Sequence, residues 1–94
     1  MTVADVGENH LVALRGEIDI SNAEAVHNIL IEVAGSRITL DLSELSFVDA
    51  TGLTALVQAK RSLESLGHEL SVVGARGLVR RVIEISGLGP ELSS

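Results

Sequence analysis

A carboxylate, a hydroxyl and a glycine lie together at one joint of the sequence, in the segment VDATGL. Apolar residues lead up to Asp49, and an apolar pattern with helical spacing resumes at Leu53. We therefore expect Asp49 and Thr51 at the N-terminus of a helix, where several backbone N–H groups lack partners and the helix dipole is positive. Because such a position stabilises anions, a hydroxyl placed there can carry a phosphate.

The same joint also has a purely structural interpretation. Asp49 or Thr51 can act as an N-cap, which stabilises a helix by about 1 kcal/mol, and Gly52 can ease the turn into the helix. A cap and a binding surface require the same local geometry. The segment alone therefore does not separate the two interpretations.

A second acidic segment, RGEID, ends another strand-like run just before a helix. Glu17 and Asp19 therefore also lie at a transition from strand to helix. Loops at the ends of strands in α/β sheets commonly carry binding residues. If the two strands are neighbours, we expect Asp19 and Asp49 to flank one acidic concavity around Thr51.

The composition excludes several classes of function. The 94 residues suit one small domain spanning residues 1–94, and a hydrophobic fraction of 46% is typical of a globular protein. The absence of cysteine removes disulfides, thiol nucleophiles and thiolate metal sites. The net charge is −6 and Phe47 is the one aromatic residue, whereas nucleic-acid binding normally needs a basic surface with stacking aromatics.

Metal and membrane sites are not expected either. The three histidines, His10, His27 and His68, lie far apart and lack the spacing of metal ligands, so we expect no metal site and no cofactor. No apolar run is long enough to cross a bilayer, and the first residues lack the basic and apolar regions of a signal peptide. We expect a cytoplasmic protein without direct membrane insertion.

Apolar periodicity predicts the element order β-β-α-β-α-β-α with short connections, which indicates an α/β fold with parallel crossovers. The expected strands cover residues 3–6, 10–16, 37–42 and 68–74, with strand character again at 47–48, and the expected helices cover residues 21–35, 53–67 and 75–87. Residues 7–9 would form a hairpin turn between the first two strands.

Two helices carry more detailed expectations. In the first helix, Ser21 and Glu24 match the S-x-x-E capping box, and Gly35 can close the helix. The last helix is expected to bury the residues of one apolar stripe, Leu78, Val79, Val82 and Ile83. Its basic residues, Arg76, Arg80 and Arg81, are interpreted as a solvated helix face rather than a partner site.

Three segments together resemble a known family. LRGEIDISNAEAV, LDLSELSFVDATGLTALV and LVRRVIEISGL occur in the order and spacing of a STAS domain. The resemblance runs from about Val3 to Leu92 and is strongest to the stand-alone bacterial anti-sigma factor antagonists. It implies a single STAS-like domain with a mixed four- to five-stranded β-sheet and helices packed mainly on one face.

The resemblance also implies a partner and a switch. Members of this family bind an anti-sigma factor with the fold of an ATP-binding serine/threonine kinase and thereby release the sigma factor. The anti-sigma factor phosphorylates a serine or threonine in a D-[ST]-[ST]-G turn, a phosphatase reverses the modification, and the unmodified form binds. A phosphate adds a charge of roughly −1.5 to −2, which beside Asp19 and Asp49 would repel a packed interface.

This sequence departs from the family pattern at the acceptor. In the family the phosphorylated residue directly follows the aspartate, where this chain has Ala50, and Thr51 is one position further on. Three possibilities remain open: Thr51 is the acceptor, the protein binds without a phosphorylation switch, or regulation lies elsewhere. The resemblance implies a partner-binding surface made of the following residues: Glu17, Asp19, Asp49, Ala50, Thr51 and Gly52.

Two other functions are considered. STAS subunits of lipid-transporting ABC systems are also similar, because they carry a threonine in this turn and dock on the cytoplasmic ATPase. An enzyme using Asp49 and Thr51 is disfavoured, since no histidine is placed to act as a base and no metal cluster is present. The sequence thus favours a binding protein with no catalytic residues.

Overall fold

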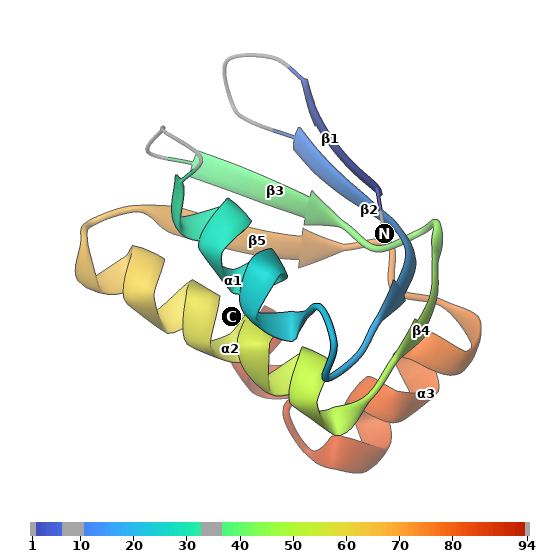
Figure 1. The fold of residues 1–94 in the computed structure, drawn as a ribbon. Helices are drawn as coiled ribbons and strands as arrows, with labels where there is room; N and C mark the ends of the chain where they lie inside the picture. Colours follow the sequence, from blue (N-terminus) through green and yellow to red (C-terminus); the bar gives the residue numbers. More distant parts are fainter. Residues whose placement is uncertain (1, 7–10, 33–36, 94) are drawn as a thin grey trace.

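The computed structural model describes residues 2–6, 11–32 and 37–93, which fold into an α/β domain (Figure 1). The strands are β1 (Thr2–Val6), β2 (Leu11–Ile18), β3 (Arg37–Asp41), β4 (Leu45–Val48) and β5 (Glu69–Val73). The helices are α1 (Ala23–Glu32), α2 (Ala50–Ser65), α3 (Gly77–Ser86) and α4 (Gly89–Ser93). The predicted hairpin turn at residues 7–9 and the predicted closure of the first helix at Gly35 lie outside the described residues.

The sheet is mixed, which confirms the predicted fold class. β1 pairs antiparallel with β2, whereas β2 with β3 and β3 with β5 pair in parallel. β2 changes partner along its length, because its first residues pair with β3 and Gly16 to Ile18 pair in parallel with β4. The β4 register skips Ser46, whose hydroxyl donates to the Gly16 carbonyl at 2.8 Å, so this bulge turns β4 along the end of β2.

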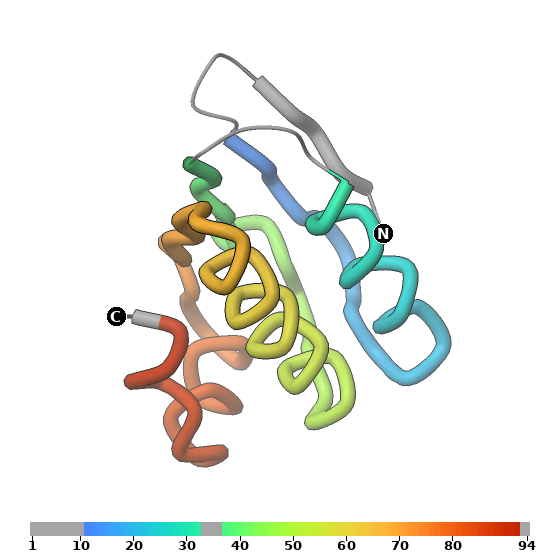
Figure 2. The backbone as a smooth tube through the Cα atoms, turned by 90° about the vertical axis from the view of Figure 1, so that its left-hand side faces the viewer, coloured from blue at the N-terminus to red at the C-terminus, as the bar shows by residue number. Residues whose placement is uncertain are grey.

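The helices form a layer beside the sheet and close its end. α1 and α2 lie side by side, as Figure 2 shows, and α2 also contacts β5. α3 packs against β4, and the short α4 packs against β5 and α2. No helix among the described residues is long and apolar enough to cross a membrane.

The core is built almost entirely from aliphatic side chains. The apolar pattern that resumes at Leu53 forms the buried stripe of α2, which consists of Leu53, Leu56, Val57 and Leu63. Strand residues on the helix-facing side of the sheet complete the core, among them Val12, Leu14, Ile18, Ile38 and Leu40. The exception is Lys60, whose residue is only 1% exposed.

Several elements differ from the sequence-based expectation. α2 begins at Ala50, before the predicted Gly52 or Leu53, because Asp49 caps it. β4 is a separate strand, and α4 follows Gly87 where no helix was expected. The prediction that Leu78 faces the core was wrong: it is 53% exposed, because α3 docks on the sheet through Val79 and Ile83.

Candidate functional site

The two acidic joints meet at one end of the sheet. β2 and β4 are parallel neighbours, with Ile18 opposite Val48, and the Asp49 N–H donates to the Ile18 carbonyl at 3.1 Å. The carboxyl ends of both strands therefore lie side by side. This is the condition under which the sequence predicted a shared site. Each strand continues directly into the loop that starts a helix (Figure 1).

The Asp49 carboxylate joins these two loops. One oxygen, Oδ1, accepts a hydrogen bond from the Gly52 N–H at 2.7 Å and so caps α2. The other, Oδ2, accepts from the Ile20 N–H at 3.2 Å, across a sequence separation of 29 residues. Asp49 is therefore the predicted N-cap, and it also holds the loop between β2 and α1 against the start of α2.

Gly52 is required by close packing at this point. A Cβ atom on residue 52 would lie 2.7 Å from Ile18 Cγ2 and 2.9 Å from the Ile18 carbonyl oxygen. The first turn of α2 thus lies directly against the end of β2. Gly52 is buried beneath the surface formed by its neighbours, so its contribution to the predicted site is to let the two loops approach.

Asp19 organises the loop between β2 and α1. Its Oδ1 accepts hydrogen bonds from the Ser21 N–H at 2.9 Å and the Ser21 hydroxyl at 2.5 Å. The hydrogen bond from the Ser21 side chain, followed by that from its backbone, lowers the pKa of Asp19. The Asn22 side chain completes the loop. Its Nδ2 donates to the Glu17 carbonyl at 2.9 Å, and its Oδ1 accepts from the Asp19 N–H at 2.9 Å.

The predicted capping box of the first helix does not form. α1 begins at Ala23, and the first carbonyl to accept from its N-terminus is that of Asp19, from the Ala23 N–H at 2.9 Å. The Ser21 hydroxyl donates to Asp19, and within the described ranges no hydrogen bond joins Ser21 to Glu24. In a capping box the Glu24 carboxylate would accept from the Ser21 N–H, but here the Asp19 carboxylate accepts from that N–H instead.

Thr51 faces solvent, as the phosphorylation hypothesis requires. Thr51 and Ala50 are both exposed in the first turn of α2. In the described part of the chain the Thr51 hydroxyl makes no hydrogen bond, whereas the Thr54 hydroxyl donates to the Ala50 carbonyl at 2.8 Å. Thr51 and Thr54 line a groove of about 450 Å³ between α1 and α2, opposite Glu24 and His27.

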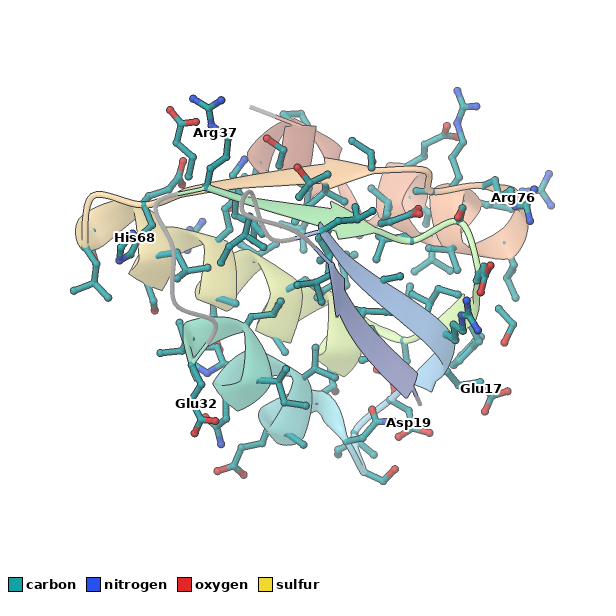
Figure 3. All side chains as sticks on the ribbon, turned by 90° about the horizontal axis from the view of Figure 1, so that it is seen from above. Glu17, Asp19, Glu32, Arg37, His68 and Arg76 are labelled. Atoms are coloured by element: carbon teal, nitrogen blue, oxygen red, sulfur yellow. The ribbon has the colours of Figure 1, made fainter. Side chains whose placement is uncertain are left out.

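The remaining predicted residue, Glu17, lies at the same end of the molecule. Figure 3 shows Glu17 and Asp19 at one corner, where β2 ends. Glu17 is exposed on β2 directly before the buried Ile18. We define the acidic docking surface, which is named for the predicted partner binding, as Glu17, Asp19, Ile20, Asp49, Ala50 and Thr51.

Ile20 was not identified from the sequence. Its residue is 77% exposed, although its backbone N–H is held by Asp49. The available signal was an isoleucine between Asp19 and Ser21 in a turn, where an apolar side chain has no core to enter. Periodicity does not detect such a residue, because it belongs to neither the strand nor the helix.

Nothing in the described residues suggests metal chemistry. Among them, no group of three or more histidine, cysteine, aspartate or glutamate side chains is arranged to hold a metal ion. His27 lies half-buried in the α1–α2 groove, and the half-buried His68 follows α2 at the far end of that helix. The arrangement at the acidic docking surface is thus one of fixed loops, exposed side chains and negative charge.

Comparison with known proteins places this chain and its fold in one family. The family model described as "Mlab, STAS domain" matches residues 1–92. The anti-sigma-B factor antagonist of Listeria monocytogenes is 37% identical over 81 residues, which span 82% of this chain and 70% of that protein. A crystal structure of an anti-sigma factor antagonist from Mycobacterium paratuberculosis matches 95% of this chain and 78% of its own, with 29% identity and a TM-score of 0.77.

A further structural match agrees in fold. The anti-sigma factor antagonist SpoIIAA in its unphosphorylated form covers 89% of this chain and 81% of its own, with 20% identity and a TM-score of 0.69. The mixed sheet and the helices beside it are thus shared with this protein. Since the family model spans nearly the whole sequence, the chain belongs to the STAS domain family.

Proposed function

We propose that this protein is an anti-sigma factor antagonist, which binds an anti-sigma factor of the ATP-binding serine/threonine kinase fold and so releases the sigma factor. The Listeria relative, which is named an anti-sigma-B factor antagonist, supports this role. The observation that carries the proposal is the joint itself. Asp49 fixes both loops, which leaves Ile20 and Thr51 exposed and Asp19 half-buried at the same end of the sheet.

The proposed action is binding, with no catalysis by this chain. The acidic docking surface has no paired base for the Thr51 hydroxyl in the described residues, and its carboxylates accept hydrogen bonds from neighbouring loop atoms. Negative charge at the surface favours association with a basic partner and raises the rate of encounter. We place this interaction in the cytoplasm, where a kinase-fold partner has access to ATP.

Thr51 is our candidate acceptor for phosphate in the proposed switch, with a phosphatase as the enzyme that would reset it. Asp49 is the N-cap, so Thr51 lies in the first turn of α2, where the helix dipole favours an added negative charge. The same charge would lie beside Asp19 and Asp49 and would oppose binding of a partner. An antagonist that binds without this switch is the other form of the proposal, because Ala50 occupies the usual acceptor position.

Incubation with purified kinase-fold anti-sigma factors and ATP, followed by intact-mass measurement, tests the proposal. We expect a stable complex and the addition of one phosphate that is lost in Thr51→Ala. Thr54→Ala is the matched control, because Thr54 lines the same groove but its hydroxyl is bound to the Ala50 carbonyl. Complex formation with no change in mass supports the form without a switch, and the absence of any complex contradicts the proposal.

A second candidate is a STAS subunit that docks on the ATPase of a lipid-transporting ABC system. The family model that matches residues 1–92 carries the description Mlab, and a threonine, Thr51, stands in the first turn of α2 in this chain. Under this alternative, the purified protein forms a complex with such an ATPase and none with a kinase-fold anti-sigma factor. Parallel binding measurements with both partners therefore separate the two functions.

A further inference from the structure

We infer that Ile20 is the apolar anchor of the acidic docking surface, that Asp49 positions it, and that the anti-sigma factor receives it in an apolar pocket rimmed by lysine or arginine. This inference rests on the proposed function. It adds the residue that carries the contact and the chemistry of the partner surface that fits it.

The first step is the exposure of Ile20. A large apolar side chain that is 77% exposed loses its contact with water when a partner covers it. In interfaces, a few such central residues supply most of the binding energy, while the polar residues around them mainly exclude water. Ile20 is an exposed apolar residue among such polar residues, because Asp19 precedes it, Ser21 follows it and Asp49 binds its backbone N–H.

The second step is the rigidity of the loop. The Ile20 N–H is bound by Asp49, the Ser21 N–H is bound by Asp19, and the Asn22 side chain spans from Asp19 to Glu17. These hydrogen bonds hold the backbone on both sides of Ile20 before any partner arrives. A surface that is already ordered loses less conformational entropy on binding, so more of the contact energy contributes to affinity.

The third step is the charge around the side chain. Asp19 precedes Ile20, Asp49 binds its backbone and Glu17 lies three residues before it on β2. Among the described residues none of the three acids forms an ion pair with lysine or arginine. A matching partner surface therefore carries positive charge around an apolar pocket, since like charges would oppose the contact.

The chain offers a matched control for this anchor. Ile85 on α3 is 80% exposed, so it has the same side chain and nearly the same exposure as Ile20. It lies on another element, outside the acidic docking surface. Truncating each isoleucine to alanine therefore compares two equal losses of exposed apolar surface at different places.

The test measures the Kd of the unphosphorylated protein for a purified kinase-fold anti-sigma factor by titration calorimetry. We expect Ile20→Ala to weaken binding by at least tenfold, as for a central interface residue, and Ile85→Ala to change it by less than about twofold. Ile20→Leu keeps an apolar side chain of equal size and is expected to retain most of the affinity. Ile20→Asp would place a charged carboxylate in the apolar pocket of the partner and is expected to abolish measurable binding.

The positioning role of Asp49 has a readout that needs no partner. In Asp49→Ala, amide hydrogen exchange at Ile20 should accelerate at least tenfold more than exchange at Ile85, because the Ile20 N–H loses its acceptor and the Ile85 N–H does not. Unchanged exchange at Ile20 would overturn the role of Asp49.

The binding outcomes separate this inference from the proposed function. Equal affinity of Ile20→Ala and the unsubstituted protein overturns the anchor and leaves the antagonist function standing. A larger loss for Ile85→Ala than for Ile20→Ala also overturns it, because the contact would then lie on α3. If the unsubstituted protein binds no kinase-fold anti-sigma factor, the proposed function and the anchor both fail.

Discussion

The acidic docking surface and the outer face of α3 look alike by simple measures. We define the outer face of α3 as Leu78, Arg80, Arg81 and Ile85. Each region has an isoleucine that is at least three-quarters exposed, and each lies beside a hollow of similar size, about 450 Å³ at α1 and α2 and about 460 Å³ at α3. Exposure and volume therefore do not tell which region binds a partner.

The two regions differ in how their polar groups are held. On α3, Arg80 pairs with Glu84 one turn away at 3.0 Å, so the contact lies within one helix. At the docking surface, Asp49 binds the backbone of Ile20 from a different part of the chain. Local ion pairs on an exposed helix contribute little to order, whereas contacts between distant segments fix the shape of a surface.

The largest expected effect comes from Gly52→Ala, which tests how closely the two loops must approach. Its Cβ would press on the Ile18 carbonyl oxygen, so we expect the free energy of unfolding to fall by about 2 kcal/mol. Urea denaturation followed by circular dichroism measures this. Gly89→Ala is the control, because its Cβ would lie 3.7 Å from Ile83 Cγ2 in ordinary contact, and a comparable loss there would contradict the assignment.

A smaller effect is expected from Asp49→Ala, which removes the hydrogen bond between the loop before α1 and the start of α2. Loss of the cap on α2 and of the acceptor for Ile20 should lower the free energy of unfolding by about 1–2 kcal/mol. On α3, Glu84→Ala removes an exposed pair and should cost no more than about 0.5 kcal/mol. Thermal unfolding of both variants in the same buffer gives the comparison, and equal losses would remove the distinction drawn between the regions.

The smallest effect concerns the titration of Asp19. Its pKa is lowered by the Ser21 hydroxyl and backbone, so its ionised form favours the folded state above the ordinary pKa of an aspartate. That contribution is lost as the pH falls from the ordinary pKa to the lowered one. In Ser21→Ala, NMR titration should show the Asp19 pKa moving back up towards its ordinary value, and an unchanged pKa would show that the hydroxyl has no such role.

Much of the site was predictable from the sequence because of how parallel strands are arranged. Strand-to-helix joints of neighbouring parallel strands must lie at the same edge of a sheet, and this brings the loops of Asp19 and Asp49 together. The cap, the exposed threonine and the buried stripe of α2 follow from residue type and helical spacing. The STAS family resemblance is confirmed as well.

The other features of the site and of α3 could not be predicted, because they depend on tertiary contacts that residue spacing does not reveal. The S-x-x-E pattern is present at Ser21, but the Asp19 carboxylate accepts the Ser21 N–H that Glu24 would bind in a capping box. In α3, four apolar residues formed one predicted stripe, and only the docking of the helix on β4 decides that Leu78 lies at its rim. The role of Ile20 follows from the hydrogen bond between its N–H and Asp49, which residue spacing does not predict.

The burial of Lys60 has a practical consequence for studying this protein. It is the one lysine in the sequence, and its Nζ donates to the Leu92 carbonyl of α4 at 3.3 Å. Amine-directed cross-linkers and dyes therefore find no exposed lysine on the folded domain. Acylation of Lys60 requires its Nζ to become exposed, so the rate of that reaction reports local opening around this lysine without any introduced probe.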